Sequence, residues 1–243
     1  MSVFATLVDV TWRALLGRRR TLLLLLLAAL PVIVALLARL GGARLDDGLT
    51  AILELGVRTV LPLTALVFGV SALGAELDDG TVVFILAKPI LRWQVVAAKV
   101  VVAGVLTAGL SVASTLLTGI LIAGLDVEAI ATTFAFALAV AVSAFAYAAL
   151  FVALSVMTGR ALFIGLVYTL VWEGVLAGIL EGTRSFSIRE ATLSVAETLA
   201  PVGARIDGDV AVGEAVLLLA VVVAGAVALA TRRLGGFEVR GTE

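Results

Sequence analysis

Residues 21–40 read Thr-Leu-Leu-Leu-Leu-Leu-Leu-Ala-Ala-Leu-Pro-Val-Ile-Val-Ala-Leu-Leu-Ala-Arg-Leu. A helix of about 20 apolar residues crosses the hydrocarbon core of a bilayer. The stretch does not alternate between apolar and polar residues, so it is not a strand of a membrane barrel. It is too long for the apolar region of a signal peptide, and Arg39 stands where small residues would mark a cleavage site. These 20 residues therefore predict a retained transmembrane helix.

The rest of the chain has the same character. Of its 243 residues 62% are hydrophobic and 14% are charged, and the mean hydropathy is +1.22. Soluble domains have about 45–50% apolar and about 25% charged residues, so a soluble enzyme, a secreted disulfide scaffold and a disordered linker are excluded. We predict an all-α membrane protein, a single transmembrane domain over residues 1–243 whose six spans cover residues 21–40, 49–74, 95–124, 130–157, 161–180 and 212–231.

The charged residues predict the orientation of these spans. An even number of spans places both termini on one side of the membrane. That side takes eleven of the 17 basic residues: Arg13, Arg18, Arg19, Arg20, Lys88, Arg92, Lys99, Arg160, Arg232, Arg233 and Arg240. Because basic residues concentrate in cytoplasmic segments, both termini are expected in the cytoplasm.

Two segments outside the spans have helical patterns. Within residues 1–20, apolar side chains recur at helical spacing from Phe4 to Leu15, and Asp9 and Arg13 fall on the other face. This pattern predicts an amphipathic helix in the membrane interface, with Trp12 at the level of the head groups. The external loop, residues 181–211, mixes apolar and charged residues before Pro201, which predicts one or two short helices at the outer surface.

The loop between the second and third spans, residues 75–94, has an ordered pattern. Acidic residues open it, a short apolar stretch over residues 82–86 follows, and Pro89 and basic residues close it. The apolar stretch is too short to cross the membrane. A short apolar helix between charged ends is suited to docking on the cytoplasmic face.

The loop resembles the signature of the ABC-2 type exporter permeases, which runs Glu-x-x-x-Gly-Thr, a short apolar stretch, Pro-x-x-Arg and a Lys that enters the next span. The matching residues are Glu76, Gly80, Thr81, Pro89, Arg92 and Lys99. The amphipathic first helix, the six spans and the long external loop are also similar to that family. Within the family, the chain looks most like the short permeases of the nitrous-oxide-reductase maturation type.

The resemblance implies a permease that does no ATP chemistry itself. The chain has no Gly-x-x-x-x-Gly-Lys-Ser/Thr phosphate loop, so ATP and Mg²⁺ would be bound by two copies of a separate ATPase. A second permease copy would complete a homodimer in a prokaryotic cytoplasmic (inner) membrane. The loop would be the coupling element: Glu76, Gly80 and Thr81 at the contact with the ATPase, Pro89 at the end of the coupling helix, and Arg92 and Lys99 as anchors at the membrane surface.

Three charged residues lie inside the predicted spans. Glu54 and Arg58 stand four positions apart in the second span, which is the spacing of a helical ion pair. Glu173 lies in the fifth span at a similar depth, so we expect Arg58 to be shared by Glu54 and Glu173. Ionisable residues at depth are costly and often functional. The cluster is either a packing contact or a polar patch on the transport path.

Other residues within the spans have structural interpretations. Pro31 and Pro62 could kink the first and second spans. Small residues in the third and fourth spans permit close packing of these helices; they include Gly109, Ala113, Ser114 and Gly119, then Ala139, Ser143 and Ala146, beside Tyr147.

Rival functions are weighed against an exporter permease. A membrane-embedded transferase could bind Mg²⁺ through paired aspartates, but the further aspartates it needs are missing. The chain has no His and no Cys, and we predict no catalytic residue, no metal site and no bound cofactor. An ion-coupled transporter would show inverted repeats, and the two halves have no clear symmetry. The apolar spans favour a hydrophobic or amphipathic substrate, and no nucleic-acid partner is expected.

Overall fold

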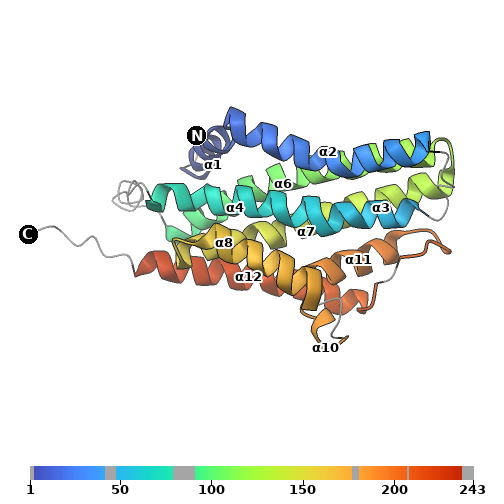
Figure 1. Ribbon diagram of the computed structural model, residues 1–243. Helices are drawn as coiled ribbons and strands as arrows, with labels where there is room; N and C mark the ends of the chain where they lie inside the picture. Colours follow the sequence, from blue (N-terminus) through green and yellow to red (C-terminus); the bar gives the residue numbers. More distant parts are fainter. Residues whose placement is uncertain (1–2, 42–47, 79–90, 177–180, 207, 237–243) are drawn as a thin grey trace, which may run out of the picture.

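The computed structural model describes residues 3–41, 48–78, 91–176, 181–206 and 208–236. Within these ranges all regular secondary structure is helical (Figure 1). Apolar runs of this length can satisfy their backbone hydrogen bonds inside a bilayer only as helices or closed barrels. The prediction of an all-α membrane protein is therefore confirmed.

The long helices follow the predicted spans closely. Their bounds are α2 Arg18–Leu40, α3 Leu49–Leu55 continued by η1 Gly56–Val60 and α4 Leu61–Asp78, α6 Arg92–Ala123, α7 Val127–Met157 and α12 Val212–Gly235. All five are long and apolar enough to cross a membrane. The fifth predicted span, residues 161–180, corresponds to α8 Ala161–Val167 and η2 Tyr168–Leu176, whose described length is shorter, and residues 177–180 lie outside the described part.

The helices run roughly parallel to one long axis (Figure 1). The start of α2 and the end of α12 lie at one end of the bundle, which we call the terminus end. The opposite end, with the α6–α7 connection, is the far end. α7 lies at the centre and packs against α6, α4, α12 and α11 Ile188–Leu199. In the most apolar 18-residue stretch of each helix, 67% of α7 is buried inside the structure, against 22% of α2 and 17% of α12.

The α6–α7 contact depends on small side chains. A methyl group at Gly119 of α6 would overlap the side chain of Thr133 of α7, so only glycine allows this approach. Ala139, Ser143 and Ala146 of α7 are buried. The expected close packing is confirmed at Gly119 but not at Gly109, where a methyl group would meet open space.

Hydrogen bonds connect α6 to two other spans. The Ser114 hydroxyl donates to the Ala28 carbonyl oxygen of α2 over 2.5 Å, and the hydroxyls of Thr64 and Ser111 join α4 to α6 over 3.2 Å. Such bonds between helices help to hold a bundle together where water is absent.

The N-terminal helix α1, Val3–Leu15, is amphipathic as predicted. Thr11 and Leu15 are buried, whereas Trp12 and Arg13 are exposed, and Arg13 forms an ion pair with Asp9 over 3.2 Å. Its place in the membrane interface stays a prediction.

Two spans contain π-helical segments, η1 in the second and η2 in the fifth. Pro62 stands two residues after the end of η1 and has no N–H to give to the carbonyl group of Arg58. The lost α-helical bond accounts for a change of backbone register at this point. Segments of this kind are frequent at functional sites.

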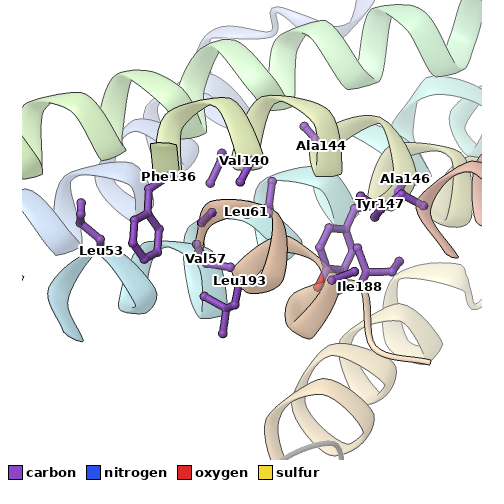
Figure 2. Packing of buried hydrophobic residues seen from close by; sticks show 14 of the residues in the cluster. Leu53, Val57, Leu61, Phe136, Val140, Ala144, Ala146, Tyr147, Ile188 and Leu193 are labelled. Atoms are coloured by element: carbon purple, nitrogen blue, oxygen red, sulfur yellow. The ribbon is translucent and has the colours of Figure 1, made fainter. Parts of the chain in front are cut away.

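The loop that is predicted to be external, residues 181–211, contains two short helices, α10 Glu181–Arg184 and α11, as predicted. α11 is more deeply buried than a surface helix would be: eight of its residues are buried, including both Arg189 and Glu190. Figure 2 shows Ile188 of α11 beside Tyr147 of α7, and Leu193 near Val57 of η1. The loop therefore contributes to the core at the far end.

Candidate functional site: a paired loop base and a polar cavity between two spans

The first site lies at the terminus end, where the second and third spans border residues 79–90. Glu76 is near the end of α4, and Lys99 is two turns into α6. The Lys99 ammonium group forms an ion pair with Oε1 of Glu76. The Lys99 side chain is only 3% exposed and that of Glu76 22%. We call this ion pair the loop-base pair.

The loop-base pair ties together the two helices that border the segment 79–90. Removing one partner of a buried ion pair leaves an uncompensated charge, which is strongly destabilising. The pair therefore fixes the spacing of α4 and α6. A force applied to the loop would reach both spans together.

Arg92 lies apart from this pair. It is the exposed first residue of α6, and its Nη1 lies 3.3 Å from the position of a methyl group built on Gly235. The guanidinium group is thus beside the C-terminal end of α12, where the helix dipole favours a positive charge. Gly80, Thr81 and Pro89, and the expected coupling helix over residues 82–86, lie outside the described residues, so their roles stay predictions.

The second site lies in the membrane-spanning part. Arg58 of η1 donates from Nη2 to Oε2 of Glu54 over 2.8 Å, so the expected ion pair within the second span is confirmed. The Glu54 side chain is 16% exposed and that of Arg58 is 52% exposed. Arg58 is nine residues after the start of α3, or about 14 Å along the helix, well inside a hydrocarbon core of about 30 Å.

The expected ion pair between Arg58 and Glu173 is wrong. Four other donors surround the Glu173 carboxylate, which is 3% exposed. Oε1 accepts from the Tyr168 hydroxyl at 2.8 Å and the Ile188 N–H at 3.1 Å; Oε2 accepts from the Ser187 hydroxyl at 2.5 Å and the Arg189 N–H at 3.3 Å. We call this arrangement the Glu173 cap. The first turn of α11, rather than Arg58, satisfies the buried carboxylate.

The π-helical segment η2 makes part of the Glu173 cap possible. Tyr168 and Glu173 are five residues apart. In an α-helix positions five apart are rotated by about 140° from each other, since one turn takes 3.6 residues. The wider π-helical turn brings the two side chains to one face, where they form a hydrogen bond.

Ser187 caps the start of α11. Ser187 is the N-cap residue and its hydroxyl oxygen accepts from the Glu190 N–H over 3.2 Å. The Glu190 carboxylate in turn binds Nε and Nη2 of Arg189, at 3.1 Å and 2.5 Å, in a buried ion pair. Arg189 and Glu190 thus neutralise each other inside the bundle.

A cavity of about 220 Å³ lies between the second and fifth spans, where both contain their π-helical segments. α7 and α11 complete its wall. The lining residues are Arg58, Thr59, Pro62, Leu63, Tyr147, Thr169, Leu170, Glu173, Gly174 and Arg189. The cavity brings Arg58 and Glu173 to one site even though they form no ion pair with each other.

Sequence reasoning missed several residues of this site. Ser187, Arg189 and Glu190 were read only as part of an external loop, and Tyr168 was not singled out. One signal was present, because Ser-Ile-Arg-Glu at 187–190 has the spacing of a capping box and marks the start of a helix. Within the described ranges, no group of three or more His, Cys, Asp or Glu residues gathers as a metal site.

The chain matches a known family along most of its length. The profile of a family described as ABC-2 family transporter protein matches residues 12–234, which is nearly the whole chain. The comparison with curated proteins found no match.

Proposed function

This chain belongs to the ABC-2 family of transporter proteins, and we propose that it is the permease subunit of an exporter driven by separate ATPase subunits. The family is a membrane component of transport and implies association with an ABC ATPase. In this proposal two permease copies and two ATPases form the complex, and ATP and Mg²⁺ are bound by the ATPases. The substrate is a hydrophobic or amphipathic molecule.

The loop-base pair is the observation that carries the proposal. In this proposal the coupling element is the loop between the second and third spans, and Glu76 and Lys99 join those two spans on either side of it. Closure of the ATPases on binding ATP would push this loop. Two helices tied at its base would tilt together, because rigid elements transmit such a push as a hinge or shear motion.

The proposed orientation places the terminus end in the cytoplasm. Exposed basic residues stand at this end on four helices or their connections: Arg13, Arg92, Arg160, Arg232 and Arg233. The positive-inside rule favours this side for the cytoplasm of a prokaryotic inner membrane. The same orientation makes the terminus end accessible to a soluble ATPase.

The proposed transport path runs along the second and fifth spans. Their charged and hydroxyl side chains line the cavity, and both spans contain π-helical segments. A backbone with interrupted α-helical bonds changes its register more readily than a continuous helix. The third and fourth spans, uninterrupted in the structure, would then form the fixed part of the permease.

Co-purification and reconstitution test the proposal. The full chain is expressed with an ABC ATPase encoded beside it, and the complex is placed in liposomes. We expect stable co-purification and ATP-dependent transport of an amphipathic dye. Glu76→Lys should lower transport by about tenfold or more without loss of membrane insertion, because it sets two positive charges against each other.

The charge-swapped variant Glu76→Lys/Lys99→Glu is the matched control, because it restores an ion pair with the opposite polarity. Recovery of transport in this variant would support a role of the pair in holding the loop base. Full transport in Glu76→Lys alone would contradict the coupling role. Transport driven by an ion gradient without any ATPase would overturn the proposed function in favour of an ion-coupled transporter.

A further inference from the structure

The cavity between the second and fifth spans has hydrogen-bond donors but no free carboxylate. Both oxygens of Glu173 are occupied in the Glu173 cap. Glu54 is paired with Arg58, and Glu190 is paired with Arg189. The carboxylates of Glu54 and Glu190 are therefore neutralised by arginines of the chain, and the Glu173 carboxylate is held by four neutral donors.

Donors remain on three side chains of the cavity wall. Arg58 binds Glu54 through Nη2 alone, and Arg189 binds Glu190 through Nε and Nη2. Hydrogen bonds from the other guanidinium nitrogens, Nε and Nη1 of Arg58 and Nη1 of Arg189, to described residues are absent. The hydroxyls of Thr59 and Thr169 donate to carbonyl oxygens of their own helices, so they add no free donor.

The third donor is the hydroxyl group of Tyr147. Tyr147 is 0% exposed and lines the cavity beside the Glu173 carboxylate, and its hydroxyl makes no hydrogen bond of ordinary length and angle to a described residue. An unsatisfied buried hydroxyl costs about 1–3 kcal/mol. Phenylalanine would fill the same space without that cost, so this hydroxyl favours a ligand that brings an acceptor group into the cavity.

Arg58 gives a second, independent sign of a ligand. Its side chain is 52% exposed although it lies well inside the membrane-spanning part. A charged group at this depth is costly in lipid and is found where it faces an aqueous cavity or an opposite charge. An acceptor group in the cavity would satisfy it.

We propose that this cavity binds the anionic head group, a phosphate or a carboxylate, of an amphipathic molecule. Arg58, Arg189 and Tyr147 donate to the head group. The apolar chain of the molecule lies along Leu63 and the exposed Leu170, which are also part of the wall. This proposal names the chemical class of the substrate. It rests on the proposed function only in treating the bound molecule as the transported one.

The size of the cavity is suited to a head group and not to a whole lipid. Its volume of about 220 Å³ lies below the ~300–1,000 Å³ of pockets that enclose a whole drug-sized ligand. A phosphate or carboxylate group occupies a part of that space, and the hydrocarbon tail must extend out of it. Charge-assisted hydrogen bonds to an anion are about twice as strong as those between neutral groups, and guanidinium groups bind phosphate and carboxylate well.

Ligand binding to the full chain in neutral detergent tests the inference without any ATPase. Trp172, next to Glu173, is the reporter in a background in which Trp12 and Trp93 are replaced by Phe. The probes are dodecyl phosphate, dodecyl maltoside with the same tail and a neutral head, and inorganic phosphate without a tail. We expect saturable binding of dodecyl phosphate, weakened about tenfold or more by Arg58→Gln and about three- to tenfold by Tyr147→Phe.

Two controls separate binding from folding. Arg13 forms an ion pair with Asp9, four residues away, as Arg58 does with Glu54, but it lies outside the cavity. Arg13→Gln should therefore bind dodecyl phosphate like the parent chain. Tyr147→Phe should unfold at the same temperature or higher, since it removes an unsatisfied hydroxyl, and yet bind more weakly. If Arg58→Gln fails to fold, Tyr147→Phe alone still decides the question.

The remaining outcomes distinguish the sources of the anion and the failures of the two proposals. Inorganic phosphate that binds as tightly as dodecyl phosphate would support the anion site and assign it to a soluble anion. An equal response to dodecyl maltoside, or unchanged affinity in both cavity variants, would overturn the inference. Glu76→Lys should bind dodecyl phosphate like the parent chain although it loses transport. Failure of the coupling proposal and failure of the anion-site proposal are therefore distinguishable.

Discussion

The α6–α7 contact and the junction of η2 with α11 are both buried, but different interactions hold them together. α6 and α7 are continuous helices that meet through small side chains, with Gly119 against Thr133. η2 and α11 meet through the Glu173 carboxylate, which accepts three hydrogen bonds from the start of α11 and a fourth from Tyr168 of η2 itself. The first contact depends on shape and the second on the Glu173 cap. We therefore expect the second to open separately from the first.

Glu173→Ala should have the largest effect. It leaves the donors of Tyr168, Ser187 and the first turn of α11 without an acceptor in a buried place, a cost of about 3 kcal/mol or more. Hydrogen exchange measured by mass spectrometry should rise over residues 188–199 and stay unchanged in α6 and α7. The exposed Glu214 of α12 provides the control Glu214→Ala. Equal protection of α11 in Glu173→Ala and the parent chain would show that the carboxylate does not hold this junction.

Gly119→Leu should follow, with a loss of about 2–3 kcal/mol, because the added side chain forces α6 and α7 apart. The loss is measured as a lower midpoint of thermal unfolding in detergent. Gly109→Leu, in the same helix but against open space, should change the midpoint little. Equal unfolding midpoints of Gly119→Leu and Gly109→Leu would show that the α6–α7 contact does not depend on the small residue at position 119.

Ser187→Ala should cost about 1 kcal/mol, the usual value for a lost N-cap. It also removes one of the four donors to Glu173. A double-mutant cycle with Glu173→Gln measures the coupling of the two residues, and we expect their effects to be less than additive. Strict additivity would mean that Ser187 and Glu173 act independently.

Arg13→Gln should have the smallest effect, less than about 0.5 kcal/mol, because exposed ion pairs contribute little. Arg13 and Asp9 are exposed on α1, away from both regions. A chemical denaturation curve should superimpose on that of the parent chain. A large shift would show that α1 supports the bundle through this pair.

The sequence predicted what depends on local pattern. The spans follow from apolar runs of sufficient length, and the Glu54–Arg58 pair follows from a spacing of four residues within one helix. The amphipathic face of α1 follows from its periodicity. In each case the interacting residues are neighbours on one helix, so the geometry of the helix decides the result.

The partner of Glu173 could not be predicted in the same way. It depends on where a loop helix, beginning fifteen residues later at Ile188, enters the bundle. Arg58 was the expected partner because it lies at a depth similar to that of Glu173 in the predicted spans. Equal depth does not determine which faces of the two helices are in contact. The π-helical register of η2 is equally hidden, because no proline within residues 168–176 marks it, in contrast to Pro62 after η1.

The central place of α7 has a consequence for biogenesis. Its partners α4 and α6 are synthesised before it, whereas α11 and α12 emerge from the ribosome after it. With a mean hydropathy of 2.3, α7 can enter lipid through the translocon by itself, but its packing is complete only when α12 has joined it. Chains truncated before residue 212 would therefore leave the α12-facing side of α7 uncovered.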